Sequence, residues 1–119
     1  MTASETSTMV WLVTEGRVLA SAEMASDRAS RRRGLLGRTR LEGAFILPSC
    51  RWVHTIGMKF PIDVAYLDAD GVVVKTVHMP RHRVGAPVWR ARTVVEVSAG
   101  SFGRWGVRVG DRLEIRSAT

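Results

Sequence analysis

The stretch that decides the fold is residues 61–78, PIDVAYLDADGVVVKTVH. Apolar runs lie on both sides of Asp68–Gly71, and Asp and Gly accept the backbone angles that a tight turn requires. We therefore predict an antiparallel hairpin here. Because side chains alternate along a strand, Ile62 and its alternate neighbours should face one way, and Asp63 with its own alternates should face the other.

Shorter signals on both sides indicate further strands. Met9–Val13 and Arg17–Ser21 flank a turn that contains Gly16, and this pattern predicts a second hairpin. Strands are also expected at Thr93–Ser98 and Arg112–Arg116.

One short helix interrupts the strands. Asp27 is the expected N-cap, the helix should run to about Arg33, and Gly34 should end it in a left-handed conformation. Several short strands and one helix predict a mainly β domain of the β-rich α+β type. We expect it to be compact, mostly antiparallel and barrel- or sandwich-like, with the helix packed on it.

Length and composition indicate a single domain. A chain of 119 residues can bury one core, so we predict a frayed tail at 1–8 and one globular domain at 9–119. The only cysteine, Cys50, excludes an internal disulfide and fits a reducing compartment. The apolar run 9–13 is too short for a signal peptide or membrane span, so we expect a cytoplasmic protein without membrane contact.

The chain carries a formal net charge of +7 and a pI near 11.2. This surplus fits either a polyanionic partner or a soluble surface. The candidate anion-binding residues are Arg32, Arg38, Arg81 and Arg83. Because their spacing matches no groove-reading motif, nucleic-acid binding is possible but not favoured.

Four segments together resemble a known family. They occur in the order Gly34–Arg38, His54–Asp68, Val95–Gly100 and Gly106–Asp111. This set is similar to the family called domain of unknown function 192, over roughly residues 21–115. The resemblance implies a small β-rich domain with a short helix, found in bacteria and archaea. It implies no established activity.

Asp63 marks a candidate polar site, because a lone carboxylate in an apolar strand is costly unless it has a partner. His54 is the predicted partner, since Gly57 can reverse the chain between them and a carboxylate would orient the imidazole. Thr55 and Met58 complete the candidate cluster. In an enzyme His54 would be a general base, and otherwise these polar groups would satisfy the backbone near an irregular turn.

Glu96 is a second unusual acid, because it lies within a run of valines. Alternation places it on the face opposite Val95 and Val97. We expect it to point to solvent or to pair with an arginine such as Arg38. Cys50 is expected to be an inert, half-buried thiol.

The sequence gives no metal-binding pattern. His78 and His82 have the spacing of one helical face, but Pro80 between them forbids a regular helix. No Cys-x-x-Cys or His-Glu-x-x-His is present, so we expect no metal and no cofactor. Trp11 and Trp52 lie in apolar runs and are expected in the core.

Three hypotheses about function remain open. The preferred one is a non-enzymatic module that binds an unknown small molecule or protein, with a pocket mouth formed around Gly57 and by the basic loop Pro80–Pro87. The alternative is an enzyme centred on His54 and Asp63. The second alternative is a binder of nucleic acid or another polyanion. The oligomeric state stays open.

Overall fold

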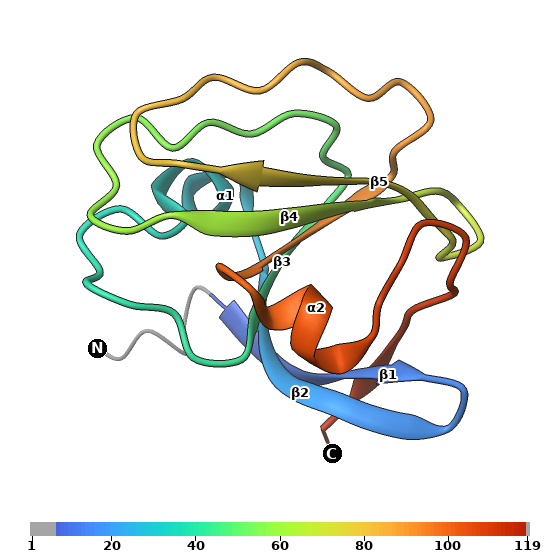
Figure 1. The fold of residues 1–119 in the computed structure, drawn as a ribbon. Helices are drawn as coiled ribbons and strands as arrows, with labels where there is room; N and C mark the ends of the chain where they lie inside the picture. Colours follow the sequence, from blue (N-terminus) through green and yellow to red (C-terminus); the bar gives the residue numbers. More distant parts are fainter. Residues whose placement is uncertain (1–6, 119) are drawn as a thin grey trace.

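The computed structural model describes residues 7–118. The elements, shown in Figure 1, are β1 (Ser7–Thr14), β2 (Arg17–Ala25), α1 (Arg28–Arg33), β3 (Ala44–Pro48), β4 (Ile62–Leu67), β5 (Val73–Met79), β6 (Thr93–Ser98), α2 (Ser101–Trp105) and β7 (Glu114–Ser117). Within this part of the chain, no helix is long and apolar enough to cross a bilayer.

The strands form one sheet in the order β5-β4-β6-β3-β2-β1-β7. Neighbouring strands are antiparallel except for β2 and β3, which run parallel. The two edge strands are β5 and β7, and the residues just before them, Val72 and Arg112, form an isolated bridge. The sheet is therefore curled and sandwich-like, not a closed barrel, and the predicted mainly β, mostly antiparallel fold class is confirmed.

Both predicted hairpins are present. In the β1–β2 turn, Glu15 and Gly16 both have positive φ, +48° and +78°, as a two-residue turn of this kind requires. In the β4–β5 turn, Asp68 Oδ1 accepts hydrogen bonds from the amides of Asp70 at 2.9 Å and Val72 at 3.0 Å. These local contacts explain why the sequence alone identified both turns.

The N-terminal boundary differs from the prediction. Strand β1 begins at Ser7, two residues before the expected start at Met9, because Ser7 and Thr8 pair with Ala25 and Met24 of β2. Residues 1–6 of the predicted tail lie outside the described residues.

Helix α1 follows the sequence signals closely. The carboxylate of Asp27 accepts a hydrogen bond from the Ser30 amide at 2.7 Å, which caps the helix start. The amide of Gly34 donates to the Ser30 carbonyl at 2.9 Å, and Gly34 has a φ of +47°. The predicted helix, its cap at Asp27 and its end at Gly34 are confirmed, but the left-handed conformation predicted for Gly34 is wrong, because its ψ is −124°.

Two elements were not predicted. Strand β3 is a continuous apolar run, AFILP, and it lies between β6 and β2, where both faces of the sheet are covered. Because both of its faces are apolar, the strand shows no alternation of polar and apolar residues. Helix α2 is a single glycine-containing turn that follows Gly100, so it adds a second short helix to the predicted one.

The sheet has an apolar cluster on each face. The first core contains Leu12, Ile46, Leu67 and Val95 together with Phe102 of α2. The second core contains Phe45, Leu47, Val64 and Tyr66, covered by Leu35 and Met58. Ile62, Val64 and Tyr66 face the second core, and Ala65 and Leu67 face the first, so the predicted alternation along β4 is confirmed.

Two long loops cover the second core. The loops at 49–61 and 80–92 run side by side above β4 and β5 in Figure 1. They are joined by backbone hydrogen bonds, including Thr55 N–H to Arg83 O at 2.8 Å and Gly85 N–H to Val53 O at 3.0 Å. This pairing holds the loop 49–61 in place beside the end of β3.

Candidate functional site

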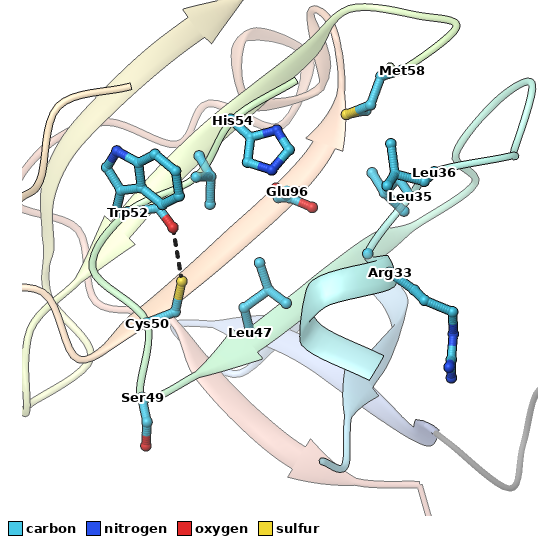
Figure 2. Close-up of a pocket in the computed structure, with 12 residues that line it drawn as sticks. Arg33, Leu35, Leu36, Leu47, Ser49, Cys50, Trp52, His54, Met58 and Glu96 are labelled. Carbon is cyan, nitrogen blue, oxygen red and sulfur yellow. Dashed lines mark hydrogen bonds between the residues drawn. The ribbon is translucent and has the colours of Figure 1, made fainter. Parts of the chain in front are cut away.

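A cavity of about 370 Å³ opens beside the second core (Figure 2). It lies between the end of α1, the end of β3 and the loop 49–61. Its walls are Arg33, Gly34, Leu35, Leu36, Leu47, Ser49, Cys50, Trp52, Val53, His54 and Met58, and Glu96 of β6 completes the lining. The lining is mostly apolar, and Glu96 contributes the only carboxyl among the described lining residues.

Glu96 sits where the central strands meet. It pairs in register with Phe45 of β3 and Val64 of β4, and only 4% of its surface is exposed. Among the described residues its carboxyl has no hydrogen-bond or ion-pair partner, and in Figure 2 it points into the cavity. Burial raises the pKa of Glu96 to about 8, so the group is mostly protonated at neutral pH.

The expected surroundings of Glu96 need correction. Its side chain lies opposite Val95 and Val97, as alternation predicted, but it neither points to solvent nor pairs with Arg38. Arg38 instead makes a two-pronged ion pair with Glu23, in which Nη2 and Oε1 are 3.2 Å apart. The guanidinium also lies 5.6 Å from the centre of the Phe45 ring. Arg38 is therefore engaged outside the cavity.

His54 and Trp52 form one wall of the cavity. Their rings are tilted against each other with centroids 5.6 Å apart. The Nδ1 atom of His54 accepts a hydrogen bond from the Ile56 amide at 3.2 Å, which leaves the ring proton on Nε2 when the imidazole is neutral. Trp52 is 43% exposed, and Trp11 is 41% exposed. The prediction that both tryptophans are core residues is wrong, because Trp52 borders the cavity and Trp11 lies at a partly open position of β1.

Two further acidic groups lie near the floor. The Cys50 thiol donates to the Trp52 carbonyl at 3.1 Å. Burial, with smaller contributions from Cys50 and Glu96, raises the pKa of Tyr66 to about 12.

Arg33 lines the rim, but its side chain points away from the cavity in Figure 2.

The structure places Asp63 in a different pair from the one predicted. Its Oδ1 lies 2.8 Å from His78 Nδ1, and its Oδ2 accepts the Gly100 amide at 2.8 Å. Asp63 is therefore paired, as its position in an apolar strand required, but not with His54. The β4–β5 register places His78 directly opposite Asp63, whereas His54 pairs with Val84 and lines the cavity on the other face.

Thr55 and Met58 take separate roles. Thr55 is fully buried, and its Oγ1 donates to the Pro80 carbonyl at 2.6 Å and accepts the Arg83 amide at 2.9 Å. It therefore joins the two loops and does not line the cavity. Met58 is 4% exposed and forms part of the wall.

Arg81 and Arg83, two of the remaining candidate arginines, do not line the cavity. Arg81 and Arg83 are exposed in the loop 80–92. The side chain of Arg32 lies outside the described part of the structure. Within that part no group of three or more His, Cys, Asp and Glu side chains is arranged to hold a metal ion.

Sequence reasoning missed most of the cavity wall. Leu35, Leu36, Leu47, Cys50 and Trp52 come from three separate segments and carry no shared motif. Three candidate residues did reach the cavity: His54 and Met58 in its wall, and Glu96, an acid inside a run of valines, at its floor.

The curled sheet, the paired loops and the acid-floored cavity define a small β-rich domain with a built pocket. The chain belongs to the DUF192 family, the domain of unknown function 192, described as "Uncharacterized ACR", whose model matches residues 10–115. The resemblance seen in the sequence is therefore confirmed.

Two solved structures share the fold. One is a "putative transcription regulator" from Sinorhizobium meliloti 1021, with a TM-score of 0.74 and 24% identity over 92% of this chain and 93% of that chain. The other is a protein of unknown function from Novosphingobium aromaticivorans DSM 12444, with a TM-score of 0.74 and 22% identity over 91% and 84%. No curated protein matches the chain.

Proposed function

We propose that this protein is a non-enzymatic binding module whose pocket takes a small, largely apolar molecule. The observation that carries this proposal is the Glu96 carboxyl, which is 4% exposed, points into the cavity and has no partner among the described residues. Among the described residues no side-chain oxygen is both fully buried and without a hydrogen bond, so the Glu96 oxygens are reachable from the cavity. A ligand that fills the cavity and bonds to Glu96 avoids the free-energy cost of taking this carboxyl out of water without a partner.

The size and chemistry of the cavity support the same function. Small-molecule sites have volumes of roughly 300–1,000 Å³ and combine apolar walls with a few polar groups. A volume of about 370 Å³ lies at the small end of this range. Leucine, methionine and tryptophan side chains form the walls, and Glu96 and His54 supply the polar contacts.

The segments that carry the family resemblance also converge on this pocket. Gly34–Leu36 belongs to the first segment, His54 and Met58 to the second, and Glu96 to the third. Three stretches that are distant in the sequence therefore contribute to one cavity. This convergence favours a role for the pocket over a role for the exposed arginines.

The alternatives have less support. An enzyme centred on His54 and Asp63 needs the two side chains together, and they belong to opposite faces of the sheet. A polyanion binder needs arginines that are free to contact phosphates, and Arg38 is already paired with Glu23. We propose the cytoplasm as the compartment, because a chain with a single cysteine suits a reducing environment.

A thermal-shift screen against metabolites tests the proposal, because a ligand that binds only the native state raises the melting temperature. Each hit is then located by NMR on the indole N–H signals. Trp52 borders the pocket and should shift, whereas Trp89, which is 75% exposed in the loop 80–92 and absent from the lining, is the internal control.

Alkylation of Cys50 provides a second test, because it blocks the pocket chemically. Cys50 lines the cavity and is the only cysteine, so N-ethylmaleimide adds bulk at one known place. Alkylated protein should lose the ligand-induced thermal shift, and bound ligand should slow the alkylation. Ligands that leave Trp52 unchanged and still bind the alkylated protein would refute the assignment of function to this pocket.

A further inference from the structure

We propose that the ligand is a compact apolar amine whose protonated nitrogen binds the carboxylate of Glu96. This inference rests on the proposed function and names the chemical class of its ligand. It follows from the position of Glu96, the only carboxyl among the described residues that line the cavity, and from the absence of a basic partner among the described residues around it.

When Glu96 is ionised, none of the described groups around it compensates the negative charge of its carboxylate. Tyr66 of β4 interacts electrostatically with Glu96 and Cys50, and Cys50 and His54 share the cavity lining with Glu96. Tyr66 and Cys50 supply no positive charge in any state. The His54 Nδ1 atom already accepts the Ile56 amide, an arrangement that suits the neutral imidazole.

Arg33, the arginine among the described lining residues, does not compensate the charge of ionised Glu96 either. Arg33 lies at the end of α1, and its side chain extends away from the cavity in Figure 2. Among the side chains that the structure describes, none supplies a cation to Glu96, so in this proposal the ligand supplies it.

A protonated amine makes a stronger hydrogen bond with the Glu96 carboxylate than a neutral ligand makes with the protonated acid. A hydroxyl or carbonyl ligand makes one ordinary hydrogen bond with the protonated acid. A protonated amine makes a charge-assisted hydrogen bond, which is shorter and roughly twice as strong as a neutral one. The aromatic wall adds to the preference, because a tryptophan ring such as that of Trp52 attracts a nearby cation.

Binding requires the transfer of one proton. Glu96 begins protonated, its O–H bond breaks as the ammonium ion enters, and the proton leaves to the buffer. The ammonium ion keeps all of its own protons, so charge is conserved within the pocket. Because the pKa of Glu96 is about 8, most Glu96 carboxyls are protonated at pH 7, so binding should release most of one proton per ligand.

The overall charge of +7 does not prevent this selectivity. Exposed charges are screened beyond about 8 Å at physiological ionic strength. The contact with Glu96 is direct and lies in an apolar cavity, where an ionic hydrogen bond is screened much less.

Three probes of similar shape test the inference: 2-phenylethylamine, 2-phenylethanol and phenylacetate. Calorimetric titrations at pH 7 in phosphate and in Tris measure affinity and the number of protons released. We expect the amine to bind at least tenfold more tightly than the alcohol, with release of most of one proton per ligand, and the alcohol to bind with no proton release.

Two variants assign the effect to Glu96. Glu96→Gln keeps the shape of the side chain but cannot ionise, so the preference for the amine and the proton release should both disappear. Glu42→Gln removes the same charge from an exposed position, and it should leave both unchanged. The Glu96→Gln variant should fold, because it removes a buried acid and keeps a group of the same size.

The outcomes separate this inference from the proposed function. Equal binding of the amine and the alcohol, tighter binding of phenylacetate, or an amine preference that survives in Glu96→Gln would overturn the amine assignment and leave a functional pocket. Failure of all three probes also overturns it. If the broader metabolite screen then yields no ligand that shifts Trp52, the proposed function is overturned as well.

Discussion

Replacing Glu96 by glutamine should change how the stability of the protein depends on pH. The pKa of Glu96 is about 8 in the folded protein, against an ordinary value of 4.5. Between these two pH values the folded state holds a proton that the unfolded state has lost. Stability therefore falls as pH rises through this interval, and it becomes level above about pH 8.

The size of the effect follows from the same two values. Each pKa unit corresponds to about 1.4 kcal/mol, so a difference of 3.5 units sets a ceiling of about 5 kcal/mol. Relaxation of the cavity and entry of water reduce this, and we expect a measured loss of about 2–4 kcal/mol. Glu96→Gln has no such loss, so its stability relative to wild type should increase steadily from pH 5 to pH 8.

The assay is urea unfolding, followed by tryptophan fluorescence at several pH values from 5 to 9. The carboxyls of Asp27, Asp68 and Glu114 have pKa values lowered from 3.8, 3.8 and 4.5 by their hydrogen bonds, so their contribution to stability is lost only below the pH range of this assay. These groups are present in both proteins, so their contribution cancels in the difference. Glu42→Gln is the control and should give a level difference. A level difference for Glu96→Gln would mean that Glu96 is ionised and paired, and both pocket proposals would fail.

Three other perturbations test separate parts of the structure. Asp63→Ala should destabilise the protein by about 1–3 kcal/mol in urea unfolding, because it removes the partner of the Gly100 amide and of His78; an unchanged midpoint would contradict this. Gly43→Ala should lower the free energy of unfolding by more than about 2 kcal/mol, because a Cβ there would meet the Ser21 carbonyl oxygen and the backbone φ is +71°. Gly103→Ala is the control: it has open space around it and should be nearly neutral. Titration with an oligonucleotide should give only weak binding at low salt, and sub-micromolar, steeply salt-dependent binding would favour the polyanion reading.

The parts of the fold that the sequence predicted are those with local signals. The cap at Asp27, the stop at Gly34 and the turn at Asp68–Gly71 each depend on contacts within about four residues. Strand β3 gave no such signal. Its residues 44–48 are apolar on both faces, and their state depends on the two strands that flank them.

The candidate site was harder to predict because its partners are set by register. Asp63 was recognised as an acid that needs a partner, but the choice between His54 and His78 depends on how β4 pairs with β5. Alternation gave the correct face for Glu96. Whether that face meets solvent or a cavity depends on α1, β3 and the loop 49–61, which come from distant parts of the sequence.

The burial of Glu96 links stability to function in one further prediction. Domains of this size are stable by about 5–15 kcal/mol, so a buried acid that costs several kcal/mol removes a large fraction of that stability. This acid, Glu96, lies at the floor of a cavity, where groups with shifted pKa values often serve function. An amine that pairs with ionised Glu96 binds more tightly as pH rises toward 8, because less work is needed to remove the proton. Saturating 2-phenylethylamine should therefore raise the unfolding midpoint more at pH 8 than at pH 5, and it should flatten the pH profile of the wild-type protein. The same ligand should add no pH dependence to Glu96→Gln, and an equal stabilisation of both proteins at every pH would show that the amine does not reach Glu96.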